Sequence, residues 1–196
     1  EAWYDTKKKI LSRVVTFQVT DRCNLKCSYC YQINKGTRRL KFEDAKALID
    51  MLLDEDPRLD DYINTRISPA IIIEFIGGEP FLEIDLIDQI TEYFKIQAAI
   101  RHHPWATMHM ISICSNGTLY FTDKVQKYLE KNKNNMSFSI TIDGNKELHD
   151  SCRVFPDGRP SYDLASAAAK DWMAKGNYMG SKITIAPGNI KYLYNA

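Results

Sequence analysis

The stretch that decides the fold is Ile71-Ile72-Ile73-Glu74-Phe75-Ile76-Gly77-Gly78-Glu79-Pro80. Its first six residues are almost all β-branched or aromatic, which predicts a buried strand that ends at the two glycines. The apolar residues that follow recur at helical spacing, at Leu86, Ile87, Ile90, Tyr93 and Phe94. A strand followed by an amphipathic helix is the unit from which parallel sheets are built.

The same unit recurs along the chain. Strands are predicted over residues 14–20, 71–76, 108–114, 136–142 and 182–186. A helical pattern fills each gap, and Pro187-Gly188-Asn189 is expected to begin one more helix. This alternation predicts an α/β fold with a parallel sheet and right-handed crossovers. A complete eight-stranded barrel needs about 250 residues, so this chain is too short for one.

Length and composition describe an ordinary globular domain. The 196 residues are 44% hydrophobic and 26% charged, close to the globular average. No apolar run reaches the roughly 18 residues of a membrane helix. A net charge of +1 favours neither nucleic acid nor a membrane surface as a partner. The chain begins at Glu1 without a signal peptide, and we expect it to be a fragment of a longer protein.

Three of the five cysteines, Cys23, Cys27 and Cys30, fall within eight residues. The odd count and the missing signal peptide argue against disulfides and predict a reducing, cytoplasmic location. A [4Fe–4S] cluster normally takes four cysteine ligands, so three would leave one iron open to another chelator. A structural zinc site would want a fourth Cys or His. A zinc-binding or purely structural role for the three cysteines remains the alternative.

Four unusual loops follow the carboxyl ends of four different predicted strands. They are the cysteine segment, Gly77-Gly78-Glu79-Pro80, Ser115-Asn116-Gly117 and Asp143-Gly144. Ligands of parallel α/β folds bind at this edge of the sheet. We therefore expect the four loops to converge on one site.

The spacing Cys-x3-Cys-x2-Cys, with Tyr29 before the last cysteine, resembles the radical S-adenosylmethionine (SAM) superfamily. Gly77-Gly78-Glu79-Pro80 resembles the motif of that superfamily that binds the SAM amino group. The resemblance implies a partial (β/α)6 TIM-like barrel over residues 14–196, with about five βα units present. Residues 1–13 are then an N-terminal extension, and the C-terminal part is missing.

The resemblance also implies the chemistry and its residues. Cys23, Cys27 and Cys30 match the ligands of a [4Fe–4S] cluster, whose open iron is chelated by SAM. One electron from the reduced cluster then gives methionine and a 5′-deoxyadenosyl radical. Tyr29 matches an aromatic near the adenine, and Asn116 lies in a segment resembling the family's third strand. Gly77 and Gly78 permit close backbone approach to a ligand, Glu79 accepts from the SAM ammonium, and Pro80 fixes the turn into the helix.

The segment from Ile140 to Arg153 resembles a narrower group, the SPASM-type maturases that modify peptides and proteins. In that group a hydroxyl residue on the fourth strand and a downstream arginine contact SAM, and Thr141 and Arg153 match them. His149 and Asp150 are expected to cap or order their own loop. Cys114 and Cys152 are expected to play no part as ligands.

The predicted function is a radical SAM enzyme that modifies a peptide, such as a ribosomal precursor that receives thioether crosslinks. A sulfatase-maturase-like oxidation of Cys or Ser to formylglycine shares every motif seen here, and a non-catalytic cluster-binding module is a further alternative. The resemblance implies an electron donor such as flavodoxin or ferredoxin. SPASM-type enzymes carry auxiliary [4Fe–4S] clusters in a Cys-rich C-terminal domain, whereas no cysteine follows Cys152 here. Either that domain is missing from this chain, or the auxiliary part is disordered or absent.

Overall fold

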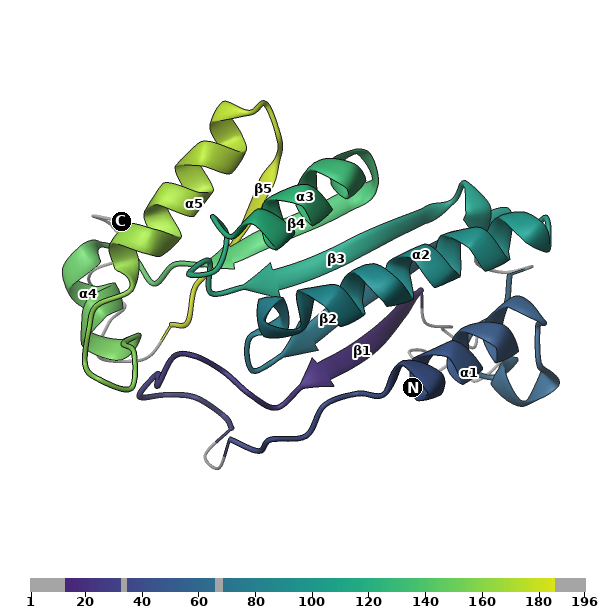
Figure 1. The fold of residues 1–196 in the computed structure, drawn as a ribbon, viewed down its shortest axis with the longest axis horizontal. Coiled ribbons are helices and arrows are strands. Elements are labelled where there is room, and N and C mark those ends of the chain that lie inside the picture. The colour runs from purple at the N-terminus through teal and green to yellow at the C-terminus, as the bar shows by residue number, and fades with distance from the viewer. Residues whose placement is uncertain (1–12, 33–34, 66–68, 186–196) are drawn as a thin grey trace, which may run out of the picture.

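The computed structural model describes residues 13–32, 35–65 and 69–185. In this part of the chain, parallel strands form one sheet in the order β1-β2-β3-β4-β5, and helices cover one of its faces (Figure 1). The strands are β1 (Val14–Thr20), β2 (Ile71–Gly77), β3 (His109–Ser115), β4 (Met136–Thr141) and β5 (Met179–Lys182). The helices are α1 (Phe42–Leu53), α2 (Ile84–Ile100), α3 (Asp123–Asn132), α4 (Lys146–Cys152) and α5 (Tyr162–Ala174). The predicted α/β fold is confirmed: its sheet order follows chain order, as in a barrel that has not closed.

The two faces of the sheet differ because successive side chains of a strand point to opposite sides. The side chains that face the helices are apolar and almost fully buried: Phe17, Ile73, Phe75, Ile111, Ile113 and Phe138. On the alternate positions, the pairing register aligns Thr16 with Glu74, Glu74 with Ser112, and Ser112 with Ser137. The sheet therefore has an apolar face against the helices and a polar row on its other face.

The helices bury one apolar stripe each against the sheet. The buried residues include Ala45 and Ile49 of α1, Ile87 and Ile90 of α2, and Trp172 of α5. Phe138 of β4 is in the middle of an aromatic group, with ring centroids 5.7 Å from Phe81, 6.1 Å from Tyr120 and 5.4 Å from Trp172. This group joins β4 to the turn after β2 and to α5.

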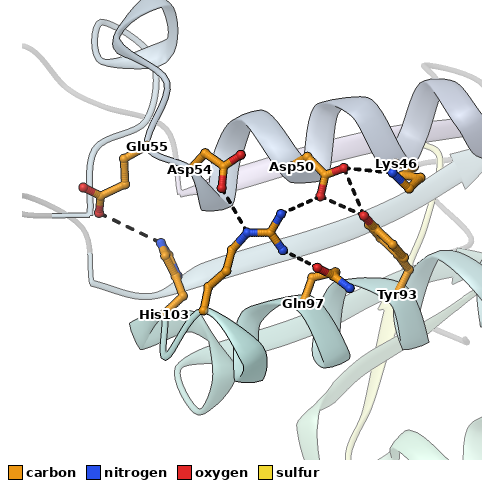
Figure 2. Close-up of polar contacts among 8 residues, drawn as sticks. Lys46, Asp50, Asp54, Glu55, Tyr93, Gln97 and His103 are labelled. Atoms are coloured by element: carbon orange, nitrogen blue, oxygen red, sulfur yellow. Dashed lines mark hydrogen bonds and ion pairs between the residues drawn. The ribbon is translucent and has the colours of Figure 1, made fainter.

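Helices α1 and α2 are also joined by a polar cluster on their outer side (Figure 2). Arg101 donates to Asp50 and Asp54 of α1, at 3.0 Å in both cases. The Tyr93 hydroxyl of α2 donates to both oxygens of Asp50, at 2.8 and 3.0 Å. This cluster is at the amino-terminal edge of the strands, away from the cysteine loop, so it fixes the helix layer rather than the site.

A fifth parallel strand is confirmed, but its predicted bounds, residues 182–186, are wrong. Strand β5 is Met179–Lys182, which pairs with Phe138–Thr141 of β4. Beyond it, the N–H of Thr184 donates to the Asp143 carboxylate at 2.9 Å instead of to β4, and Ile183 and Ile185 are exposed. The chain therefore leaves the sheet after Lys182, although residues 183–185 are rich in β-branched side chains. Residue 186 and the predicted helix after it lie outside the described residues.

Within the described residues, no helix combines the length and the apolar character required to cross a membrane. The predicted boundary between an extension over residues 1–13 and a barrel over residues 14–196 remains a prediction.

Replacing Phe138 by Ala should lower the free energy of unfolding by about 3–5 kcal/mol, because it leaves a cavity among three aromatic rings. Urea unfolding followed by circular dichroism measures this. Phe121→Ala is the matched control, since that side chain is 52% exposed, and it should cost about 1 kcal/mol. Equal losses for the two variants would contradict the packing described here.

Candidate functional site

The cysteine loop follows β1 and is closed at its base by the chain that returns to α1. The Asp21 N–H donates to the Arg38 carbonyl and the Leu40 N–H to the Val19 carbonyl, both at 3.0 Å. The buried side chain of Leu25 anchors the loop, and the Lys35 ammonium donates to the Leu25 carbonyl. The loop thus has a defined path around its three cysteines.

The far side of the loop rests on the segment that follows α4. The Lys26 N–H donates to the Val154 carbonyl at 2.7 Å, and the Ser28 N–H donates to the Cys152 carbonyl at 2.9 Å. Cys152 therefore touches the cysteine loop through its backbone, and its thiol lies near Ser151. That Cys152 is not a ligand remains a prediction.

The thiols of Cys23, Cys27 and Cys30 are half-buried and close enough to influence one another electrostatically. Burial raises the pKa of the Cys23 and Cys27 thiols, against the opposing effects of Lys35 and, for Cys27, of Arg153. These thiols therefore keep their protons until a metal or cluster displaces them.

The donor set suits a cluster. Among the described residues, no three His, Cys, Asp or Glu side chains surround a single point as one metal ion requires. A cluster makes a different demand, because each thiolate binds a different iron. Three neighbouring but separate thiols on one short loop meet that demand.

The two glycines after β2 allow this strand to approach the cysteine loop. A Cβ on Gly78 would lie 2.3 Å from the Arg22 carbonyl oxygen and 2.8 Å from the Cys23 Cβ, and one on Gly77 would lie 2.8 Å from the Thr20 oxygen. The Glu79 N–H donates to the Arg22 carbonyl at 2.9 Å. Glycine is thus required at both positions because a side chain would overlap the backbone of Thr20 or Arg22. Contact of the glycines with a cofactor remains a prediction.

The Glu79 carboxylate is buried and joins β2 to the end of β3. It accepts from the Ser115 hydroxyl and the Asn116 N–H, both at 2.8 Å, and from the Phe81 N–H at 3.1 Å. Burial raises the pKa of Glu79, and these hydrogen bonds oppose the rise. A carboxylate accepts about four hydrogen bonds, so Glu79 has capacity left for the predicted ammonium. Pro80 begins the 3₁₀ turn Pro80–Glu83, as expected.

Asn116 bridges the β3 loop to the cysteine loop. Its amide donates to the Asn24 oxygen at 2.8 Å, and its oxygen accepts from the N–H and hydroxyl of Thr118. Asn24 in turn donates to the Thr118 hydroxyl at 2.8 Å. The observed role of Asn116 is thus to order the loop, and a cofactor contact remains a prediction. Ser115 lies in a loop that was expected to reach the site, whereas Asn24 and Thr118 were not predicted as site residues; Asn24 is polar within the cysteine motif, which is a weak signal.

Tyr29 is held between Asp143 and Arg153. Its hydroxyl donates to the Asp143 carboxylate and accepts from Arg153 Nη1, the latter at 2.7 Å. Burial and the hydrogen bond to Asp143 raise the pKa of Tyr29 to about 12. The side chain is 37% exposed, so one part of the ring remains open at the site.

Arg153 carries a buried donor that is open to an anion. The residue is 92% buried, and although its Nη1 donates to Tyr29, its Nε has no hydrogen-bond partner among the described residues. A buried N–H without an acceptor is costly, and a planar carboxylate is the group that suits a guanidinium best. The predicted SAM carboxylate fits this requirement. Thr141, at the end of β4, has its hydroxyl 3.6 Å from the Cys114 thiol, and its contact with SAM remains a prediction.

His149 and Asp150 order the loop that carries Arg153, as expected. His149 Nδ1 accepts from the Asp143 N–H at 3.2 Å, and Nε2 lies 3.0 Å from the Ser161 hydroxyl, which donates to the Arg153 carbonyl. Asp150 accepts from the N–H groups of Ser161 and Tyr162 at the start of α5. This network fixes both Asp143 and Arg153.

Comparison with known proteins identifies relatives. The family model described as Radical SAM superfamily matches residues 17–171. The serine-type anaerobic sulfatase-maturating enzyme of Bacteroides thetaiotaomicron is 31% identical over 141 residues, which are 71% of this chain and 31% of that protein.

Two solved structures share the fold. The structure of anSMEcpe with bound AdoMet and the Kp18Cys peptide has a TM-score of 0.73 at 20% identity, over 93% of this chain and 46% of that one. The structure of Streptococcus suis SuiB bound to the precursor peptide SuiA has a TM-score of 0.62 at 16% identity, over 94% and 36%. The chain spans less than half the length of these relatives.

Gly78→Ala should loosen the cysteine loop, because the new methyl group overlaps the Arg22 backbone. We expect a loss of about 1–3 kcal/mol and faster tryptic cleavage after Lys26 and Lys35. Gly158→Ala is the control: its φ of +85° makes Ala unfavourable, yet nothing lies within 4 Å of the new methyl group. The control should lose stability without faster cleavage in the loop; equal cleavage in both variants would refute the close approach.

Asp143→Asn should lower the free energy of unfolding by about 1–3 kcal/mol, because an amide cannot accept fully from both Tyr29 and Thr184. Asp157→Asn is the matched control at an exposed position and should change it by at most about 0.5 kcal/mol. Urea unfolding measures both. A neutral effect of Asp143→Asn would show that the Tyr29–Asp143–Arg153 contacts do not stabilise the site.

Proposed function

This chain belongs to the radical SAM superfamily, and we propose on that premise that it cleaves SAM reductively at a [4Fe–4S] cluster held by Cys23, Cys27 and Cys30. The bound cluster would supply the electron that breaks the C5′–S bond of SAM. The observation that carries the proposal is the contact between the Gly77–Pro80 motif and the cysteine loop, in which Glu79 N–H bonds the Arg22 carbonyl. That contact puts the Gly77–Pro80 motif, which would bind the SAM amino group, beside the first cysteine.

The chain's own residues would then bind and orient SAM. Glu79 would accept a hydrogen bond from the SAM ammonium, because its three internal hydrogen bonds leave one acceptor position free. Arg153 would pair with the SAM carboxylate through its unpartnered Nε, while Tyr29 would lie near the adenine. Gly77, Gly78, Pro80, Asn116 and Thr141 complete the proposed cofactor site. An external one-electron donor, a flavodoxin or ferredoxin, would reduce the cluster.

We propose a peptide or protein as the substrate. The similarity to a sulfatase-maturating enzyme and the fold shared with two peptide-bound structures support this class. The Ile140–Arg153 segment, which resembles the SPASM-type maturases, supports it further. Thioether formation and oxidation of Cys or Ser to formylglycine both fit the residues described. Auxiliary clusters, if the protein has them, would belong to a C-terminal part beyond this chain.

Cys27→Ala should abolish both cluster assembly and SAM cleavage, because two thiolates cannot replace three ligands. After anaerobic reconstitution with iron and sulfide, the unaltered chain should bind about four irons and convert SAM to 5′-deoxyadenosine with dithionite. Cys152→Ala is the matched control and should retain both properties. A Cys27→Ala variant that still forms 5′-deoxyadenosine would end the proposal, and one zinc per chain without iron uptake would favour a zinc module.

The substrate class needs a separate experiment with the natural full-length protein. Candidate precursor peptides and a sulfatase-derived peptide are incubated with SAM and reductant, and the products are analysed by mass spectrometry. A thioether retains its sulfur and loses two hydrogens, whereas formylglycine made from cysteine loses the sulfur and two hydrogens and gains one oxygen. Turnover of small molecules alone would refute the peptide proposal.

A further inference from the structure

The face of the sheet that turns away from the helices carries one acidic side chain. Side chains at alternate positions of β1 to β5 form this face, and Glu74 of β2 is the one Asp or Glu among these described positions. Glu74 belongs to the polar row, in register with Thr16 of β1 and Ser112 of β3. The helices pack on the opposite face (Figure 1), so this carboxylate is not part of the apolar core.

Glu74 is oriented by a neutral partner and keeps its charge available. The Thr16 hydroxyl donates to Glu74 Oε2 at 2.8 Å. Within the described part of the chain, Glu74 forms no ion pair with a Lys or Arg. Lys182 on β5 is the one cation of the same face, and it is three strands from β2, a separation of roughly 14 Å. A carboxylate accepts about four hydrogen bonds, so Glu74 can accept from a further donor.

Two isoleucines flank the carboxylate on this face. Ile72 and Ile76 are two residues before and two residues after Glu74, and both are half-buried. Side chains two residues apart on a strand share a face and are roughly 7 Å apart. A lysine or arginine side chain has an apolar stem that packs on such residues and a charged head at its end. The isoleucines and Glu74 therefore suit a basic side chain better than an acidic one.

The carboxylate is close to the candidate cofactor site. Gly77, which ends β2 beside the cysteine loop, is three residues after Glu74, or roughly 10 Å along the strand. Ile76 lies between them on the face that carries Glu74. A ligand that reaches this face from the edge with the cysteine loop thus passes Ile76 before it meets Glu74. An extended peptide covers the same 10 Å with about three residues.

We propose that Glu74 binds a Lys or Arg side chain of the peptide substrate, within three positions of the residue that is modified. The inference rests on the proposed function, since it narrows the proposed peptide class to peptides with a basic residue near the modified one. Charge complementarity is the argument for this occupant, because the face offers a carboxylate without an ion-pair partner in the described residues. Glu74 would select the substrate without touching the reacting atoms.

The test measures how labelled synthetic peptides bind to the natural full-length protein, reconstituted with iron and sulfide and supplied with SAM. Each peptide has one cysteine in an otherwise uncharged sequence, with Lys, Gln or Glu at one of the three positions on either side of it. Fluorescence anisotropy gives the dissociation constants. At one position at least, the Lys peptide should bind about fivefold more tightly than the Gln peptide, and the Glu peptide should bind more weakly than both.

Two substitutions of Glu74 separate charge recognition from a structural role. Glu74→Gln keeps the size of the side chain and removes its charge, so the preference for Lys should fall below about twofold. Glu74→Lys should reverse the preference, so that the Glu peptide binds most tightly. Glu43→Gln is the matched control, because Glu43 is exposed on α1, on the helix side of the sheet. The control should keep the fivefold preference for Lys.

Cleavage of SAM is measured on the same samples with dithionite and without peptide. Glu74→Gln should retain this rate, because Glu74 is not among the proposed cofactor residues. If the unaltered protein fails to cleave SAM, the proposed cluster chemistry falls, while the peptide preferences still decide the role of Glu74.

Three results would overturn the proposal. The first is equal binding of the Lys, Gln and Glu peptides to the unaltered protein, or no binding of any of them. The second is a preference for Lys that persists in Glu74→Gln, which would put the acidic partner elsewhere. The third is a Glu74→Gln variant that unfolds at lower urea concentration with its peptide preference unchanged, because the carboxylate then binds a segment of the protein itself.

Discussion

The site depends on one constraint, the burial of the Glu79 carboxylate. A buried carboxylate must be hydrogen-bonded, and the donors that satisfy Glu79 come from the end of β3 and from its own turn. The backbone N–H of the same residue holds the start of the cysteine loop. One residue therefore fixes β2, β3 and the loop after β1 relative to each other, and the two glycines before it make the approach sterically possible.

A second set of contacts fixes the opposite side of the loop. Asp143 and Arg153 hold the Tyr29 hydroxyl between them, and His149 with Ser161 holds both residues in place. This side ends in a buried guanidinium nitrogen without a partner. The first set satisfies its polar groups internally, whereas the second leaves Arg153 Nε without a partner among the described residues, and this difference is why we propose Arg153 as the residue that pairs with an anionic ligand.

The charge of the cysteine segment also differs from the net charge of the whole chain. The net charge of +1 argues against a polyanionic partner for the molecule as a whole. The loop that carries the cysteines is strongly basic, and the other residues compensate for it. The average over the chain concealed this because the acids and the bases are unevenly distributed along the sequence.

The sequence by itself determined the α/β alternation, the first four strands and the cysteine motif, because these depend on local periodicity and on spacing within a few residues. It also indicated that His149 and Asp150 order their loop. Only the tertiary structure decided that β5 ends at Lys182, that Gly78 is needed against Arg22, and that Asn116 bonds Asn24. These results depend on hydrogen bonds and close contacts between residues 41 to 92 positions apart along the chain. No local pattern encodes them, because folding selects them by burial and geometry.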